Sequence, residues 1–118
     1  MQTSTVVILG STGSIGTQGL DVISRHLDRF NVVGLAAGGS HVELLAQQAV
    51  QFHVSKVAIF NTNAVHALQD ALNQAGASHV EIMAGPEAVI AMVTGLLEVA
   101  DVLVAYLEVI AQPGQSAI

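Results

Sequence analysis

Short apolar runs alternate along this chain with longer segments that carry apolar residues at helical spacing. The runs predict β-strands, over residues 5–9, 31–37, 56–60 and 80–83. The segments between them predict α-helices, over residues 14–26, 41–52, 64–74 and 86–97. In the first helix, Leu20, Ile23 and Leu27 are expected on one apolar face. This alternation is typical of an α/β fold with a doubly wound parallel sheet.

Several residues mark the expected helix ends. Ser40 is followed by Glu43 in the spacing of a capping box, so Ser40 is the expected N-cap of the second helix. The polar residues 61–63 offer a cap for the third helix, and Gly76 is suited to end it. Pro86 suits the first turn of the fourth helix, because its missing N–H leaves no hydrogen bond unmade there.

The turn between the first strand and the first helix is rich in glycine. Residues 10–16 have the sequence GSTGSIG, which is Gly-x-x-Gly-x-x-Gly rather than the usual dinucleotide pattern Gly-x-Gly-x-x-Gly. Glycines such as Gly10 and Gly13 let the backbone turn tightly and approach an anion at the positive end of the following helix. The turn is therefore predicted to bind a phosphate group; the alternative is a tight turn without a ligand.

The segment after the second strand bears on the choice of nucleotide. An NAD-binding domain normally carries Asp or Glu there, which accepts hydrogen bonds from the ribose 2′-hydroxyl. This chain has Gly38, Gly39, Ser40 and His41 instead. Because no carboxylate would repel a 2′-phosphate, the segment favours NADP(H) over NAD(H). The alternative is a flexible turn before the second helix.

Composition narrows the classes of partner. The chain has 118 residues, which suits one domain, and only 3 Lys and Arg against 9 Asp and Glu, for a formal charge of -6. Nucleic-acid binding is not expected, because it requires clustered basic residues. A bound diphosphate would have to be held by backbone N–H groups and hydroxyls.

Other classes of site find little support. There is no cysteine for a disulfide, thiolate metal site or nucleophile, and the 5 histidines are too scattered to form a metal set. No export signal or apolar stretch of membrane-spanning length is present, so the expected location is the cytoplasm, without membrane contact. No catalytic or metal-binding residue is assigned.

Two motifs together carry a family resemblance. Residues 7–18 have the sequence VILGSTGSIGTQ, and residues 29–39 have RFNVVGLAAGG. With Asp21 and Val22 between them, they resemble the N-terminal part of the 1-deoxy-D-xylulose 5-phosphate reductoisomerase family. The resemblance covers residues 5–97 and is more specific than a generic nucleotide-binding pattern.

The resemblance implies a Rossmann-like NADP-binding domain. Its family isomerises a sugar phosphate and reduces the product with NADPH to 2-C-methyl-D-erythritol 4-phosphate, in the non-mevalonate route to isoprenoids. The positions that match the family's contacts to the cofactor diphosphate are Thr12, Gly13, Ser14 and Ile15. Those that match its contacts around the ribose phosphate are Gly38, Gly39 and Ser40. Many family members carry a basic residue and an asparagine in that second segment.

The family's catalytic part has no counterpart in the sequence. Members continue into an Asn-Lys-Glu segment and an acidic cluster that holds Mg²⁺ or Mn²⁺, and full-length members are expected to be homodimers. Here the expected organisation is a cofactor domain over residues 1–98 and an out-of-pattern tail over 99–118, as after a truncation or frameshift near Glu98. The β-branched residues between 99 and 110 favour a last strand over a helix. The fold is therefore expected to be incomplete at its C-terminus.

Two functions remain open from the sequence. The chain is either the cofactor domain of a reductoisomerase, inactive alone, or a non-catalytic nucleotide-binding module or inactive remnant. The coding sequence beyond Glu98 distinguishes them, because only a reductoisomerase gene would encode the Asn-Lys-Glu segment and the acidic cluster. An aspartate-semialdehyde dehydrogenase would need a cysteine nucleophile, which this chain lacks.

We predict that the isolated chain is poorly soluble or marginally stable. A last strand within residues 99–110 would be a hydrophobic sheet edge that no later helix covers, and such edges promote aggregation. Size-exclusion chromatography and a thermal melt test this. A clean monomer with a sharp two-state transition would contradict the prediction.

Overall fold

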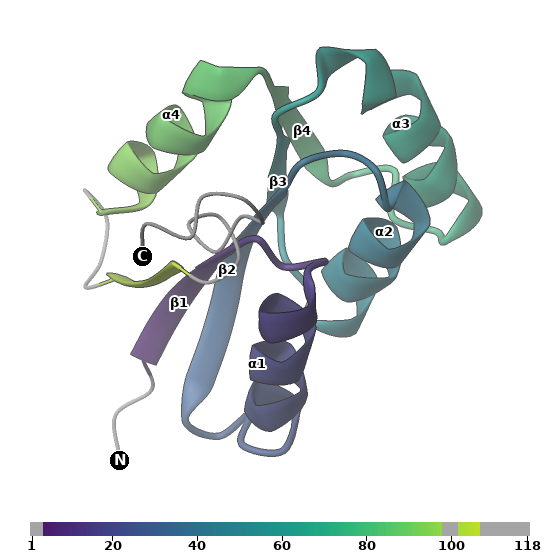
Figure 1. The fold of residues 1–118 in the computed structure, drawn as a ribbon. Helices are drawn as coiled ribbons and strands as arrows, with labels where there is room; N and C mark the ends of the chain where they lie inside the picture. Colours follow the sequence, from purple (N-terminus) through teal and green to yellow (C-terminus); the bar gives the residue numbers. More distant parts are fainter. Residues whose placement is uncertain (1–3, 98–101, 107–118) are drawn as a thin grey trace.

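The computed structural model describes residues 4–97 and 102–106 of the chain, and this part forms a single parallel sheet flanked by helices (Figure 1). The elements follow in the order β1 (Ser4–Leu9), α1 (Ser14–Ser24), β2 (Phe30–Ala37), α2 (Val42–Gln51), β3 (Lys56–Ile59), η1 (Thr62–Ala64), α3 (Val65–Gln74), β4 (Glu81–Ala84), α4 (Pro86–Leu97) and β5 (Val102–Tyr106). For the predicted strands and helices, these bounds differ from the expected ends by at most two residues.

The strand order is β4-β3-β2-β1-β5, and every neighbouring pair is parallel. The chain therefore moves outward from β1 to β4 along one side, and α4 then carries it back across the sheet to β5, on the other side of β1. This reversal is the defining feature of a doubly wound sheet, so the predicted fold class is confirmed.

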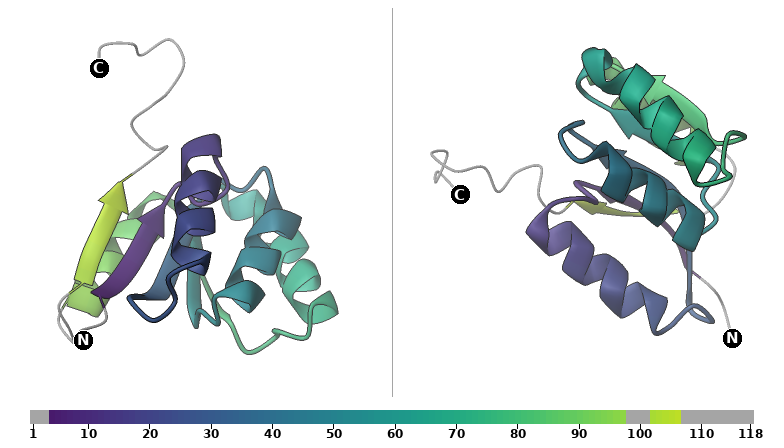
Figure 2. Two further views of the ribbon diagram at one scale, coloured as in Figure 1. Left: turned by 90° about the horizontal axis from the view of Figure 1, so that it is seen from below. Right: turned by 90° about the vertical axis from the view of Figure 1, so that its right-hand side faces the viewer.

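Helices cover both faces of the sheet: α1, α2 and α3 lie on one face and α4 on the other (Figures 1 and 2). Successive side chains of β1 point to opposite faces of the sheet. Val6 and Ile8 pack on the face covered by α1, α2 and α3, whereas Val7 and Leu9 pack on the face covered by α4. Both sets are buried. Strands covered on both faces have few polar positions, which explains the hydrophobic content of 52%.

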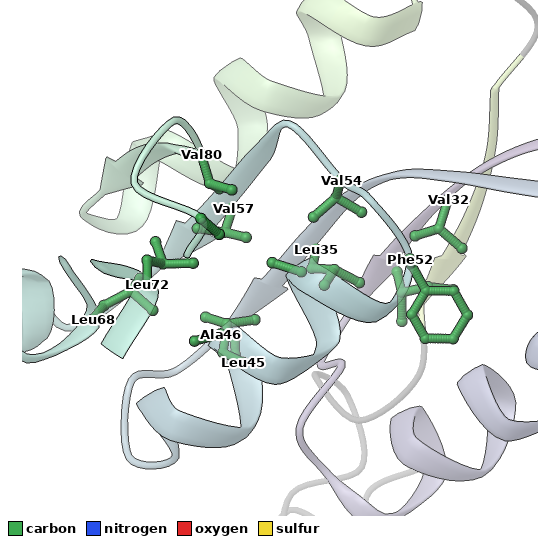
Figure 3. Close-up of a cluster of buried hydrophobic side chains, with 14 of the residues drawn as sticks. Val32, Leu35, Leu45, Ala46, Phe52, Val54, Val57, Leu68, Leu72 and Val80 are labelled. Atoms are coloured by element: carbon green, nitrogen blue, oxygen red, sulfur yellow. The ribbon is translucent and has the colours of Figure 1, made fainter. Parts of the chain in front are cut away.

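The larger core lies beneath α2 and α3. Its side chains come from the centre of the sheet and from the inner faces of these helices, and they interlock in a single cluster (Figure 3). The labelled members of the cluster are Val32, Leu35, Leu45, Ala46, Phe52, Val54, Val57, Leu68, Leu72 and Val80. The smaller core packs Met92 of α4 against Ala36 and Ala58, whose short side chains let the helix lie close to the sheet.

Most helix ends follow the sequence signals. Asn61 accepts a hydrogen bond from the Asn63 amide at 3.0 Å and so caps η1, which leads into α3. Gly76 has φ +77° just after α3, a conformation that glycine adopts without strain. Pro86 is the first residue of α4.

One expectation about the first helix was wrong. Helix α1 ends at Ser24 rather than near His26, so Leu27 lies beyond the helix and is 58% exposed instead of joining the core. The pairing of β1 with β2 shifts between Val6 and Val7, which leaves Val33 as an extra residue in β2. Such a β-bulge has no signature in the pattern of apolar positions.

The C-terminal part of the chain is described only in β5, which lies within the expected strand region and pairs with β1 from Thr5↔Val102 to Leu9↔Tyr106. The rest of the expected tail, at residues 99–101 and 107–118, lies outside the described residues. Among the helices that are described, none combines the length and apolarity required to cross a bilayer.

Candidate nucleotide-binding site

The glycine turn lies at the carboxyl end of β1, where the winding of the sheet changes direction. From this strand the chain proceeds to β2 on one side, whereas β5 arrives on the other side by way of α4. Ligands of doubly wound proteins bind in the crevice that opens at this switch point. The fold thus places residues 10–16 where a nucleotide is expected.

Hydrogen bonds to β2 hold the start of the turn in place. The amides of Gly10 and Ser11 both donate to the carbonyl oxygen of Ala36, at 2.7 and 3.0 Å, and the Gly13 amide donates to the Gly10 oxygen at 3.2 Å. Gly10 has φ +85°, a conformation that side chains with a Cβ rarely adopt. The turn is therefore a defined structure with a required glycine.

The first turn of α1 passes very close to this loop at Gly16. A Cβ atom at position 16 would lie 2.1 Å from the Gly10 oxygen and 2.9 Å from the Ser11 Cα. Glycine is the residue that fits there, because backbone atoms on both sides cannot withdraw far. This is the close helix-to-strand packing that the last glycine of a dinucleotide motif provides.

The N-terminus of α1 is suited to an anion. Its N-cap is Gly13, which has no side chain to cap the helix, and the first turn carries no acidic residue. The helix dipole therefore presents its positive end to the crevice without a carboxylate from its own first turn. Ser14 and Ile15 of that turn are exposed, and Thr12 and Gly13 are partly exposed.

The second predicted segment lies at the same edge of the sheet. Gly38, Gly39 and Ser40 follow β2, the strand next to β1, so both segments border the crevice. Gly39 has φ +119°, and a Cβ there would meet the Cβ atoms of Asn61 and Ala64 at 3.1 and 3.2 Å. A basic side chain of the kind many family members carry would be strained at Gly39 in this conformation, whereas Gly38 faces open space.

Ser40 does not cap α2, contrary to the sequence prediction. The N-cap is His41, without a side-chain cap hydrogen bond, and the Ser40 hydroxyl pairs instead with the His41 Nδ1 at 3.1 Å. The helix therefore starts one residue later than the capping-box spacing suggests, and the Ser40 hydroxyl is engaged by its neighbour instead of by an amide of the helix. Both side chains are exposed at the rim of the crevice.

The basic residues lie far from this edge. The chain has 3 Lys and Arg, and these are Arg25 after α1, Arg29 before β2 and Lys56 at the start of β3. All of them lie at the amino edge of the sheet, opposite the glycine turn, and Arg25 pairs with the exposed Asp21 at 3.1 Å. An anion in the crevice would be held by amides, hydroxyls and helix dipoles instead of salt bridges.

Gln48 contacts the glycine turn of the candidate site, although no sequence motif predicts this. Gln48 of α2 is 5% exposed, and its Nε2 donates to the carbonyl oxygen of Ser11 at 2.9 Å. The available signal was a polar residue between Leu45 and Ala49 on the buried side of an amphipathic helix. That signal alone does not identify the residue's partner.

A glycine turn against a helix N-terminus, at the switch point of a parallel sheet, defines a Rossmann-like dinucleotide-binding domain. The family model of 1-deoxy-D-xylulose 5-phosphate reductoisomerase matches residues 6–111. The chain therefore belongs to the 1-deoxy-D-xylulose 5-phosphate reductoisomerase family. The family match continues beyond Glu98, near which the sequence motifs had indicated that the resemblance to the family ends.

Individual relatives agree with the family match. The 1-deoxy-D-xylulose 5-phosphate reductoisomerase of Bifidobacterium longum (strain NCC 2705) is 72% identical over 89 residues, which are 75% of this chain and 22% of the relative. That of Streptomyces coelicolor is 49% identical over 86 residues, 70% of this chain and 21% of the relative. The chain thus spans about a fifth of the length of these proteins.

Solved structures show the same fold. The reductoisomerase from Zymomonas mobilis in complex with NADPH is similar with a TM-score of 0.68 and 40% identity, over 76% of this chain and 23% of that one. A reductoisomerase in complex with NADPH, fosmidomycin and magnesium gives a TM-score of 0.66 and 31% identity, over 74% of this chain and 21% of that one.

We predict opposite effects for the same substitution at two helical glycines. Gly16→Ala should lower the free energy of unfolding by about 1–3 kcal/mol, because the new methyl group overlaps the Gly10 carbonyl. Gly95→Ala should raise it by about 0.5–1 kcal/mol, since Gly95 is exposed in α4 and a Cβ there meets nothing within 4 Å. Urea unfolding measures both. A Gly16→Ala chain as stable as the wild type would contradict the close approach.

Proposed function

We propose that this chain is the NADPH-binding domain of a 1-deoxy-D-xylulose 5-phosphate reductoisomerase. The observation that carries the proposal is the glycine turn, which places the N-terminus of α1, with Gly13 as its N-cap, at the crevice beside β2. The complete enzyme would isomerise a sugar phosphate and reduce the product to 2-C-methyl-D-erythritol 4-phosphate. NADPH supplies the hydride for that reduction.

Each segment has a distinct part in the proposal. The turn with Gly10, Thr12, Gly13, Ser14 and Ile15 would bind the cofactor diphosphate. Gly10 and Gly13 would let the backbone approach it closely, and Thr12 and Ser14 would offer hydroxyls beside the N-terminus of α1. The segment with Gly38, Gly39 and Ser40 would bind the ribose 2′-phosphate, because it offers a hydroxyl and no carboxylate. The cofactor domain would comprise residues 1–98, and residues 99–118 would be an out-of-pattern tail that contributes the last strand, β5, to the sheet.

The rest of the enzyme would supply the substrate and metal sites. Within the described part of the chain, no group of three or more His, Cys, Asp or Glu side chains could hold a metal ion. In the proposal this chain has no catalytic or metal-binding role, and Mg²⁺ or Mn²⁺ and the sugar phosphate would bind in the remainder of a homodimeric, cytoplasmic enzyme. A non-catalytic nucleotide-binding module remains the alternative; it predicts the same binding and no Asn-Lys-Glu segment in the gene.

The first test is a charge placed in the turn. Gly13→Asp should abolish binding of NADPH and NADH, because the carboxylate would occupy the anion site at the N-cap of α1. Aspartate is a favoured N-cap residue, so the variant should remain folded. Isothermal titration calorimetry measures the binding.

Gly76→Asp is the matched control, since Gly76 follows α3 at the opposite edge of the sheet and aspartate tolerates its positive φ better than most residues. It should bind NADPH as the wild type does. Absence of saturable binding in the wild-type chain would reject the proposed cofactor role.

The second test concerns the 2′-phosphate. The wild-type chain should bind NADPH more tightly than NADH, and Ser40→Asp should reduce this preference by about tenfold through repulsion of the 2′-phosphate. Ser55→Asp, at the amino edge before β3, should leave the ratio unchanged. Fluorescence titration with both nucleotides gives the ratio; equal loss of preference in both variants would contradict the assignment.

A further inference from the structure

Two polar side chains are buried in the described part of the chain, and they belong to residues that contact each other. Ser11 is 0% exposed and Gln48 is 5% exposed. The Gln48 Nε2 donates to the Ser11 carbonyl oxygen at 2.9 Å, which links the middle of α2 to the glycine turn across 37 positions of sequence. A buried amide side chain costs free energy unless it is fully bonded, so core packing does not account for it.

The hydrogen bond between Gln48 and Ser11 leaves other buried polar atoms of the two residues without described partners. The Gln48 Oε1 and the Ser11 Oγ are both buried and have no hydrogen-bond partner among the described residues. An apolar side chain at position 48 would avoid the free-energy cost of burying the unpaired Gln48 Oε1. Gln48 also borders a hollow of about 200 Å³ between α1 and α2. The bond to Ser11 is the specific contact that Gln48 makes.

Holding the Ser11 carbonyl also sets the direction of the next amide. In a trans peptide the C=O and the following N–H point in opposite directions. There are no cis peptide bonds in the described chain, so a Ser11 oxygen held toward Gln48 turns the Thr12 N–H away from α2. This amide donates to no other group within the described residues.

We propose that Gln48 is a positioning residue that orients the Thr12 amide for the cofactor diphosphate. The inference rests on the proposed function, in which the glycine turn binds that diphosphate. The other side of the same turn is fixed by the Gly10 and Ser11 amides on the Ala36 oxygen. Gln48 supplies the remaining restraint, and it does so from the helix that follows the predicted 2′-phosphate segment at Gly38–Ser40.

The test separates ligands by whether they carry a diphosphate. Gln48→Leu should weaken binding of NADPH and ADP by about tenfold, the effect of one well-oriented hydrogen bond. Binding of adenosine 2′-monophosphate, which has no diphosphate, should change by less than about twofold. A general loosening of the domain would weaken all three ligands alike.

Gln47→Leu is the matched control, because Gln47 is the exposed neighbour of Gln48 on the same helix. It should leave all three affinities unchanged. Ser11→Ala should also bind normally, since it keeps the carbonyl that Gln48 holds and removes a hydroxyl without a described partner. A loss in Ser11→Ala as large as that in Gln48→Leu would overturn the carbonyl-based inference.

A measurement on the wild-type chain covers the case in which Gln48→Leu does not fold. In NMR spectra, the Thr12 amide and the Gln48 side-chain amide should both shift on addition of ADP and stay unchanged with adenosine 2′-monophosphate. Failure of the wild-type chain to bind any of the three ligands would overturn the proposed function and this inference with it. Wild-type binding with an unchanged Gln48→Leu variant, or with an unmoved Thr12 amide, would overturn the inference alone.

Discussion

The first turn of α1 passes so close to the carbonyl oxygen of Gly10 that residue 16 has no room for a side chain. A Cβ atom at that position would lie 2.1 Å from the Gly10 oxygen. This close approach determines how α1 leaves the sheet and where its N-terminus points. The same backbone is joined to β2 through the Ala36 oxygen, so strand, turn and helix meet in one small volume. The crevice at the switch point owes its shape to that contact, and two glycines make the contact possible.

Electrostatically, the domain is organised by backbone dipoles. Its 3 basic side chains lie at the amino edge of the sheet, while the carboxyl edge carries the N-termini of α1, α2 and α4. Glu43 and Glu87 stand in the first turns of α2 and α4, and the Asn61 side chain caps η1 ahead of α3, whereas the first turn of α1 has neither an acid nor a side-chain cap. The helix end beside the glycine turn is thus the one suited to an anion, although the formal charge of the chain is -6. Binding by fixed dipoles depends on geometry more than on net charge.

The sequence predicted those parts of the molecule that depend on local or periodic signals. Strand and helix order, the glycine turn and the end of α3 at Gly76 follow from apolar spacing and from residues with strong backbone preferences. The capping box at Ser40 failed because the Ser40 hydroxyl pairs with the His41 side chain, and the spacing of Ser40 and Glu43 does not reveal this local competition. Gln48 was missed for a different reason: its partner Ser11 is 37 residues away, and only the packed fold brings them together. Long-range pairing of polar groups leaves no periodic trace in a single sequence.

The placement of β5 has a consequence for the thermodynamics of the domain. This strand pairs with β1 up to Leu9↔Tyr106, directly before the turn begins at Gly10. Without it, β1 would be the edge of the sheet and the crevice would lose one of its two walls. A ligand that needs both walls would bind only the paired form, so by linkage it would stabilise the pairing by a free energy that rises with the logarithm of its concentration. Nucleotide binding at the turn would then be coupled to the pairing of β5 with β1, so that ligand affinity and the stability of this strand pair would change together.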